Sequence, residues 1–233
     1  MLLAVLTLGI ASLLPPGATF VEARKVTPTR ALVVWMTEAK REPDPCPPRR
    51  DWAPSCPDRT QGCHYNGLLH VSLVDTATHT LLNTLDVPGP LEGVDDIDVP
   101  YRVMTPGPYH YSRLTRKPQI IRLRDYNGDG KALEFAIFDA ESCSDLFTAL
   151  FGYSERQDRV IRYEVHVKRR GVQTADFTND WPQTVFALPP IRPGYWKFHL
   201  AFPPGPPEVP HEDWTVWYVA EKEMFEADCF TYN

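Results

Sequence analysis

The sequence lacks the local signatures of the common types of catalytic site. It contains no G-x-S-x-G nucleophile elbow, no H-E-x-x-H zinc motif, no phosphate-cradling glycine loop and no dinucleotide fingerprint. Its seven histidines are scattered along the chain. The sequence therefore identifies no catalytic residue and no residue that binds an organic cofactor, and it favours a protein that is not an enzyme.

Basic charge is also lacking. Lysine and arginine number 24 against 30 aspartates and glutamates, which gives a net charge of −6. Non-specific binding to nucleic acid requires a basic surface, so this balance argues against nucleic acid as a partner.

The sequence has only one long apolar run, residues 1–14, and this run is too short to cross a bilayer as a helix. It fits the hydrophobic region of a signal peptide, and Val21 and Ala23 stand at positions −3 and −1 of a cleavage site, although basic residues before the run are missing. We therefore expect residues 1–23 to be a signal peptide. The mature chain would be secreted or periplasmic, without a membrane span. The alternative is that the run forms a buried strand or short helix.

Cysteine is scarce and its count is odd. The odd number in an exported chain predicts disulfides with either one free thiol or one bridge to another chain, and the pairing stays open. We favour one bridge between Cys56 and Cys63 and a second between Cys143 and Cys229. Zinc bound by the three cysteines of the 40–63 loop and His64 is the alternative, but the cysteine spacings differ from the usual C-x₂–₄-C pair. The five cysteines are Cys46, Cys56, Cys63, Cys143 and Cys229.

Proline is abundant, with 24 residues, and it disfavours long helices. Apolar residues instead recur at every second position, which is typical of strands. The pattern predicts an all-β, antiparallel sandwich or barrel-like single domain over residues 24–233, with long Pro-rich loops and at most one short helix, at 142–151. The expected strands lie at 30–38, 68–74, 81–87, 97–103, 119–124, 133–137, 161–167, 195–202 and from 214 onward.

The most specific pattern is D-x-N-x-D-G at residues 125–130. Ca²⁺ takes six to eight oxygen ligands, and alternating short side chains on a curled loop supply several of them from one side. We expect side-chain ligands from Asp125, Asn127 and Asp129 and the carbonyl of Lys131. The alternative is a polar hairpin turn without metal, because Asn-Gly and Asp-Gly are strong turn signals.

Residues 120–139 resemble the calcium loop of the FG-GAP and VCBS-type repeats, which occur in extracellular β-propellers. The resemblance implies an acidic residue at loop position nine, but this position is Leu133, so Glu134 or Asp139 is expected to close the site. The loop occurs once, so a propeller is not expected. An EF-hand is excluded because Ala136 stands at position twelve, where a glutamate is required.

These observations predict an exported, calcium-binding β-rich monomer of a binding or structural type, whose partner is an extracellular protein or a glycan. The alternative is a secreted hydrolase or a carbohydrate-binding module. Aromatic residues gather in the last third of the chain, where core packing and sugar stacking are both open, with core packing favoured. They include Trp181, Tyr195, Trp196, Trp214, Trp217 and Tyr218.

Overall fold

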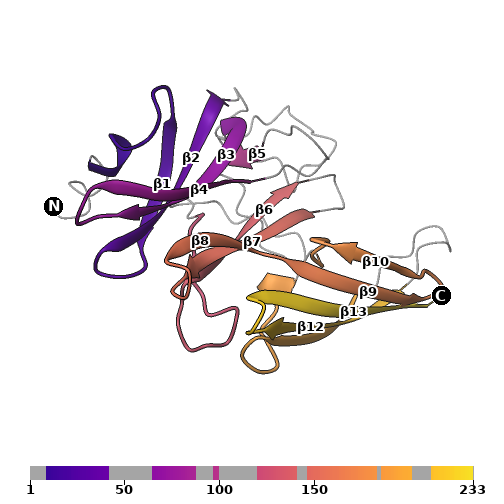
Figure 1. Ribbon diagram of the computed structural model, residues 1–233. Coiled ribbons are helices and arrows are strands. Elements are labelled where there is room, and N and C mark those ends of the chain that lie inside the picture. The colour runs from indigo at the N-terminus through magenta and orange to yellow at the C-terminus, as the bar shows by residue number, and fades with distance from the viewer. Residues whose placement is uncertain are drawn as a thin grey trace.

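The computed structural model describes residues 9–41, 65–87, 97–99, 120–140, 146–182, 185–200 and 211–232. These residues hold thirteen β-strands, a short helical turn at 9–11 and a single turn of 3₁₀ helix, Val185–Ala187. The strands form three sheets in a sandwich-like arrangement that is not a closed barrel, which confirms the predicted all-β class. Figure 1 shows a small central sheet between the N-terminal and C-terminal sheets. No helix in the described ranges is long and apolar enough to span a membrane.

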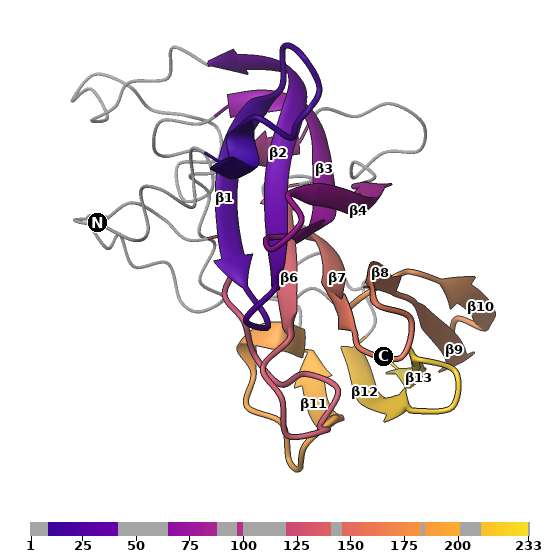
Figure 2. The same cartoon turned by 60° about the vertical axis from the view of Figure 1, so that its left-hand side comes forward.

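The N-terminal sheet has the order β1-β2-β3-β4, with β5 paired to β3 (Figure 2). Every pair in it is antiparallel, and the predicted strand at 30–38 and hairpin at 68–87 are confirmed. A β-bulge between Thr37 and Lys40 shifts the register between β2 and β3. The strands are β1 (Thr19–Lys25), β2 (Arg30–Arg41), β3 (Tyr65–Asp75), β4 (Thr80–Asp86) and β5 (Ile97–Val99).

The other two sheets use the rest of the chain. β6 (Glu134–Ala140), β7 (Leu146–Ser154) and β8 (Arg159–Tyr163) form the antiparallel central sheet. The C-terminal sheet has the order β10-β9-β13-β12-β11 and contains a parallel pair, β9 with β13. This pair departs from the expected antiparallel pattern because β13 returns from its hairpin with β12 beside β9. The strands are β9 (Val165–Gly171), β10 (Ala175–Thr178), β11 (Tyr195–Leu200), β12 (His211–Val219) and β13 (Met224–Tyr232).

Two large cores lie on opposite faces of the central sheet. The first joins the central sheet to the N-terminal sheet and contains Phe151 of β7. The second joins the central sheet to the C-terminal sheet and contains Leu150, the next residue back along β7. Because successive side chains of a strand point to opposite faces, β7 is apolar on both sides.

This double burial corrects the expected helix at 142–151. Residues 146–151 belong to β7, and their continuous apolar run reflects a strand covered on two faces. Two strand predictions also change. Residues 121–124 make only an isolated bridge from Arg124 to Glu134. The strand expected over 161–167 is divided at Glu164, where the chain passes from the central to the C-terminal sheet, although its alternation continues.

A third, smaller cluster lies on the outer face of the N-terminal sheet. Ile10 packs there with Val33, Trp35 and Val74 and is 3% exposed. The expected cleavage point after Ala23 falls inside β1, whose residues pair with β2 from Thr19 to Lys25.

Several predictions fall on residues outside the described ranges, among them the cysteine-rich loop with its possible disulfide or zinc site. Cys229 lies inside them and carries a free, buried thiol, which does not agree with the expected bridge to Cys143, itself outside.

Candidate functional site

The D-x-N-x-D-G loop is closed at its base by a short antiparallel bridge. The amide of Arg124 donates to the carbonyl of Glu134 at 2.8 Å, and the Glu134 amide donates back at 3.2 Å. The loop therefore leaves an irregular segment and enters β6 directly.

The three predicted side chains of the loop all turn inward onto its own backbone. Asp125 accepts hydrogen bonds from the amides of Gly128 at 2.7 Å and Gly130 at 2.9 Å. Asn127 Oδ1 accepts from the amide of Asp129 at 2.9 Å. Asp129 Oδ1 accepts from the amide of Lys131 at 2.8 Å. Each of these oxygens has a further lone pair, because a carboxylate or amide oxygen can accept more than one bond.

Glu134, the first residue of β6, reaches back into this loop. Its carboxylate accepts from the backbone amide of Tyr126 at 2.9 Å and from the Asn127 side chain at 3.2 Å. Leu133, at the position that the resemblance reserves for an acid, lies in the first core. Asp139 stands five residues further along β6, about 17 Å away at the rise of a strand. Of the two expected closing residues, Glu134 is therefore the one at the loop.

The surroundings of Glu134 disfavour its charged form. Its side chain is fully buried, and this burial raises its pKa to about 8. The amide hydrogen bonds of Tyr126 and Asn127 act in the opposite direction, while the charges of Asp129 and Asp125 raise the pKa further. Tyr163 lies 3.5 Å from the same carboxylate through its hydroxyl, and burial raises the pKa of this phenol as well.

No three His, Cys, Asp or Glu side chains within the described ranges gather closely enough to hold a metal by themselves. At the loop, the donor set would therefore include an amide and a main-chain carbonyl besides carboxylates. All these donors are oxygens, which suit a hard cation rather than zinc or copper.

The loop also packs tightly against the segment that leads into β11. A Cβ atom on Gly128 would lie 2.5 Å from the carbonyl carbon of Pro193, and one on Gly194 would lie 2.6 Å from the Asn127 carbonyl oxygen. The Tyr126 ring packs against Phe186 of the 3₁₀ turn in a tilted arrangement, with 4.7 Å between ring centroids and 60° between ring planes. The loop thus connects the start of β6 to the C-terminal sheet.

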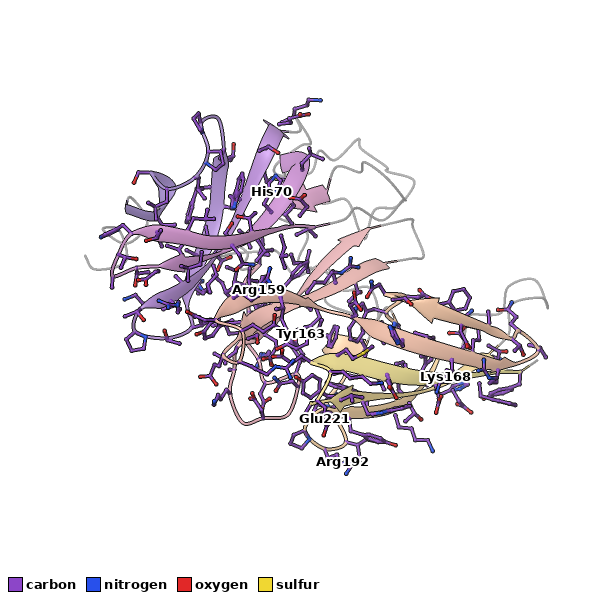
Figure 3. All side chains as sticks on the ribbon, in the orientation of Figure 1. His70, Arg159, Tyr163, Lys168, Arg192 and Glu221 are labelled. Atoms are coloured by element: carbon purple, nitrogen blue, oxygen red, sulfur yellow. The ribbon has the colours of Figure 1, made fainter. Side chains whose placement is uncertain are left out.

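A second constellation is one that the sequence pattern did not reveal. Thr37 Oγ1 lies 2.9 Å from His70 Nε2, and His70 Nδ1 lies 2.8 Å from Asp86 Oδ1. The three residues come from the adjacent strands β2, β3 and β4, and His70 stacks on Trp35 with ring centroids 4.2 Å apart (Figure 3). The three side chains lie on the same face of three neighbouring strands. The sequence can show this only when the registers of these strands are known.

The aromatic residues of the last third divide between two faces. Trp196 and Trp214 are buried in the second core, as core packing predicts. Trp217 points to the other side of β12, opposite Tyr195 of β11, where both are partly exposed. Core packing is therefore confirmed for Trp196 and Trp214, whereas Trp217 and Tyr195 lie on the outer face of the sheet.

Comparisons with known proteins found no relative. No family model, no curated protein and no solved structure matches this chain.

Proposed function

We propose that this chain is an exported calcium-binding β-protein of a binding or structural type. Asp125, Asn127, Asp129 and Glu134 would supply side-chain oxygens and Lys131 a carbonyl. The observation that carries the proposal is the position of Glu134, a buried carboxyl that reaches into a loop already holding two aspartates.

The physical reason is charge balance. Burial is the main cause of the raised pKa of Glu134, and repulsion from the charges of Asp129 and Asp125 raises it further. A divalent cation removes that repulsion and favours the ionised state of all three groups. Five oxygen donors with one or more waters reach the six to eight ligands that Ca²⁺ takes.

The role of the ion would be structural. It would hold the loop that contacts Pro193 and Gly194, and so join the central sheet to the C-terminal sheet. At a calcium concentration 100 times the dissociation constant, binding adds about 2.7 kcal/mol to the stability of the folded state.

A thermal melt of the full chain in millimolar Ca²⁺ and in EGTA tests this proposal. We expect Ca²⁺ to raise the melting temperature by several degrees, and the Asp125→Ala/Asp129→Ala variant to lose the shift. The Asp176→Ala/Asp228→Ala variant is the matched control, because it removes two exposed aspartates from β10 and β13 and should keep the shift. An equal melting temperature with and without Ca²⁺ in the unmodified chain would refute the calcium site.

A second candidate function is that of a hydrolase. It is favoured by the hydrogen bonds that join Thr37 to His70 and His70 to Asp86. In such a reaction Thr37 Oγ1 attacks an ester carbonyl and His70 Nε2 takes the hydroxyl proton, which it passes to the departing alcohol. Water then attacks the acyl-threonine. His70 takes a proton from this water and passes it to Thr37 Oγ1 as the ester bond breaks, which releases the acid and restores Thr37. The bulge that follows Thr37, with Glu38 at φ 54°, is a feature that often borders active sites.

The Asp86 side chain is 87% exposed, so it would orient His70 less firmly than a buried partner.

Labelling with a fluorophosphonate probe tests whether Thr37 is a nucleophile. Covalent labelling of Thr37 that disappears in the His70→Ala variant would support it. An unlabelled Thr37 peptide in the mass spectrum would eliminate it.

A further inference from the structure

Asn127 and Gly128 form an Asn-Gly pair within residues 125–131, the 125–131 loop. Such a pair is chemically reactive, because glycine has no Cβ and its backbone nitrogen can approach the Cγ atom of the preceding asparagine. Attack by this nitrogen releases the side-chain amide as ammonia and closes a succinimide ring. In this chain the neighbouring residues contact the groups that would react.

The reaction replaces the amide nitrogen of asparagine with an oxygen from water. The Gly128 nitrogen loses its proton and bonds to Asn127 Cγ, the Cγ–Nδ2 bond breaks, and Nδ2 leaves as ammonia with that proton. A solvent water then opens the succinimide. Cleavage between nitrogen and Cγ gives aspartate, whereas cleavage between nitrogen and the main-chain carbonyl carbon gives isoaspartate. One water is consumed and one ammonia is released.

The attacking nitrogen is fixed in the closed loop. The Gly128 N–H donates to Asp125 Oδ1 at 2.7 Å. Gly128 also lies against Pro193, since a Cβ atom on Gly128 would stand 2.5 Å from the Pro193 carbonyl carbon. Ring closure requires the loss of this N–H proton and a movement of the peptide group. The hydrogen bond to Asp125 must therefore break, and the contact with Pro193 opposes the movement.

The side chain that would be attacked is fixed as well. Asn127 Oδ1 accepts a hydrogen bond from the amide of Asp129 at 2.9 Å, and Nδ2 donates to Glu134 Oε1 at 3.2 Å. Both ends of the amide are thus held by different parts of the loop. Only local opening of the loop frees the nucleophile and the leaving group together.

We propose that Asn127 is a deamidation site that the closed 125–131 loop protects, and that opening of this loop after the loss of calcium converts it irreversibly. The calcium half rests on the proposed function above. Ca²⁺ that binds only the closed loop lowers the population of the open loop, by about tenfold at ten times the dissociation constant. A period without calcium would therefore leave a permanent chemical change in the loop.

Both products change the loop. Aspartate at 127 places a carboxylate oxygen where Nδ2 donates to Glu134, so two acidic groups face each other in the calcium-free protein. The same oxygen is a better ligand for Ca²⁺ than an amide. Isoaspartate lengthens the backbone beside Gly194, where a Cβ atom would already stand 2.6 Å from the Asn127 carbonyl oxygen. It should therefore break the contact with the segment before β11.

Peptide mapping by mass spectrometry tests the protection. The full chain is incubated at pH 8 in EGTA, in Ca²⁺ at ten times the dissociation constant, and in urea. We expect deamidation of Asn127 to be fastest in urea and about tenfold slower in Ca²⁺ than in EGTA. The internal control is a second Asn-Gly pair, Asn66-Gly67 in β3, where Asn66 pairs with Lys40 and Asp98. Its deamidation should not differ between Ca²⁺ and EGTA.

The outcomes separate the parts of the proposal. Equal rates at Asn127 in EGTA and in urea, or no deamidation of Asn127 in urea, would overturn the protected site. Equal rates in Ca²⁺ and EGTA, in a chain whose melting temperature does rise with Ca²⁺, would overturn the coupling and leave the calcium site intact. Equal rates in a chain whose melting temperature does not respond to Ca²⁺ would remove the calcium half together with the proposed calcium function.

The Asn127→Asp variant reproduces one product and tests its effect. We expect a lower melting temperature than that of the unmodified chain in EGTA, and a larger rise on addition of Ca²⁺. Gln173→Glu is the matched control, because it adds the same charge at an exposed residue and keeps the oxygen that accepts from Arg169 at 3.3 Å. It should change neither value. An Asn127→Asp variant that melts like the unmodified chain in both conditions would contradict the proposed effect of the modification.

Discussion

Gly128 lies directly against Pro193, so closely that a Cβ atom at residue 128 would stand 2.5 Å from the Pro193 carbonyl carbon. Gly128 also has φ 79°, a conformation that L side chains rarely adopt. This contact joins the loop at residues 125–131 to the turn before β11.

Replacing Gly128 should therefore break this junction. Gly128→Ala adds a steric clash to the cost of a positive φ, and we expect a loss of about 2 kcal/mol or more in the free energy of unfolding. Gly130→Ala is the matched control, since Gly130 has φ 87° but open space around its Cα, and should cost about 1 kcal/mol. Urea unfolding of both variants in EGTA compares them, and equal losses would contradict the contact.

Glu134→Gln should alter the pH dependence of stability of the calcium-free protein. The pKa of Glu134 is raised to about 8 in the folded state, above its unfolded value near 4.3. Its contribution is therefore complete below about pH 4 and is lost as the pH rises to about 8. We expect the glutamine variant to lack this decline in urea unfolding between pH 5 and 9, and to bind Ca²⁺ more weakly. Parallel pH profiles would count against a buried, proton-binding Glu134.

The ion pair between Arg30 and Asp158 should lose its contribution to the free energy of unfolding in acid. Arg30 Nη2 lies 2.6 Å from Asp158 Oδ2, and this bond, with that from the Tyr153 hydroxyl, lowers the pKa of Asp158 to about 2. A lowered folded pKa gives stability that is present above about pH 4 and is lost as the pH falls to 2. Asp158→Asn should flatten this part of the urea-unfolding profile, whereas Asp228→Asn, at an exposed position on β13, should not.

Cys229 should resist thiol reagents in the folded protein. Burial raises the pKa of its thiol to about 12, and the charge of Glu212 raises it further against the opposing effect of Arg169. Because the thiolate is the reactive form, we expect iodoacetamide at pH 8 to leave the Cys229 peptide unmodified until denaturant is added. Mass spectrometry of that peptide gives the answer, and rapid native labelling would contradict the buried site.

Cleavage after Ala23 should weaken the fold. It would remove most of β1, including Val21 in the first core and the Glu22 carboxylate, which accepts a hydrogen bond from the Ile120 amide at 2.7 Å. Burial of a valine alone contributes about 2 kcal/mol. We expect a chain that begins at residue 24 to unfold at lower urea than one that begins at residue 17, which keeps β1. Equal midpoints would show that β1 contributes little.

The sequence alone was sufficient for the features that depend on neighbouring residues. Alternation of apolar side chains placed β3, β4, β11 and β12, because a strand covered on one face must alternate. A continuous apolar run placed β2, which is covered on both faces. The same locality put Asp125, Asn127 and Asp129 in one loop, since their spacing is what lets each side chain reach the backbone two or three residues ahead.

Long-range contacts decided the rest. The apolar run that follows Ser142 and Asp145 looks like a short helix, yet residues 146–151 form β7 because two separate cores cover its faces. The parallel placement of β13 beside β9, and the meeting of Thr37, His70 and Asp86, both depend on strand registers that no local pattern encodes. Pro193 meets Gly128 only because distant segments pack together, and such packing is a property of the folded chain as a whole.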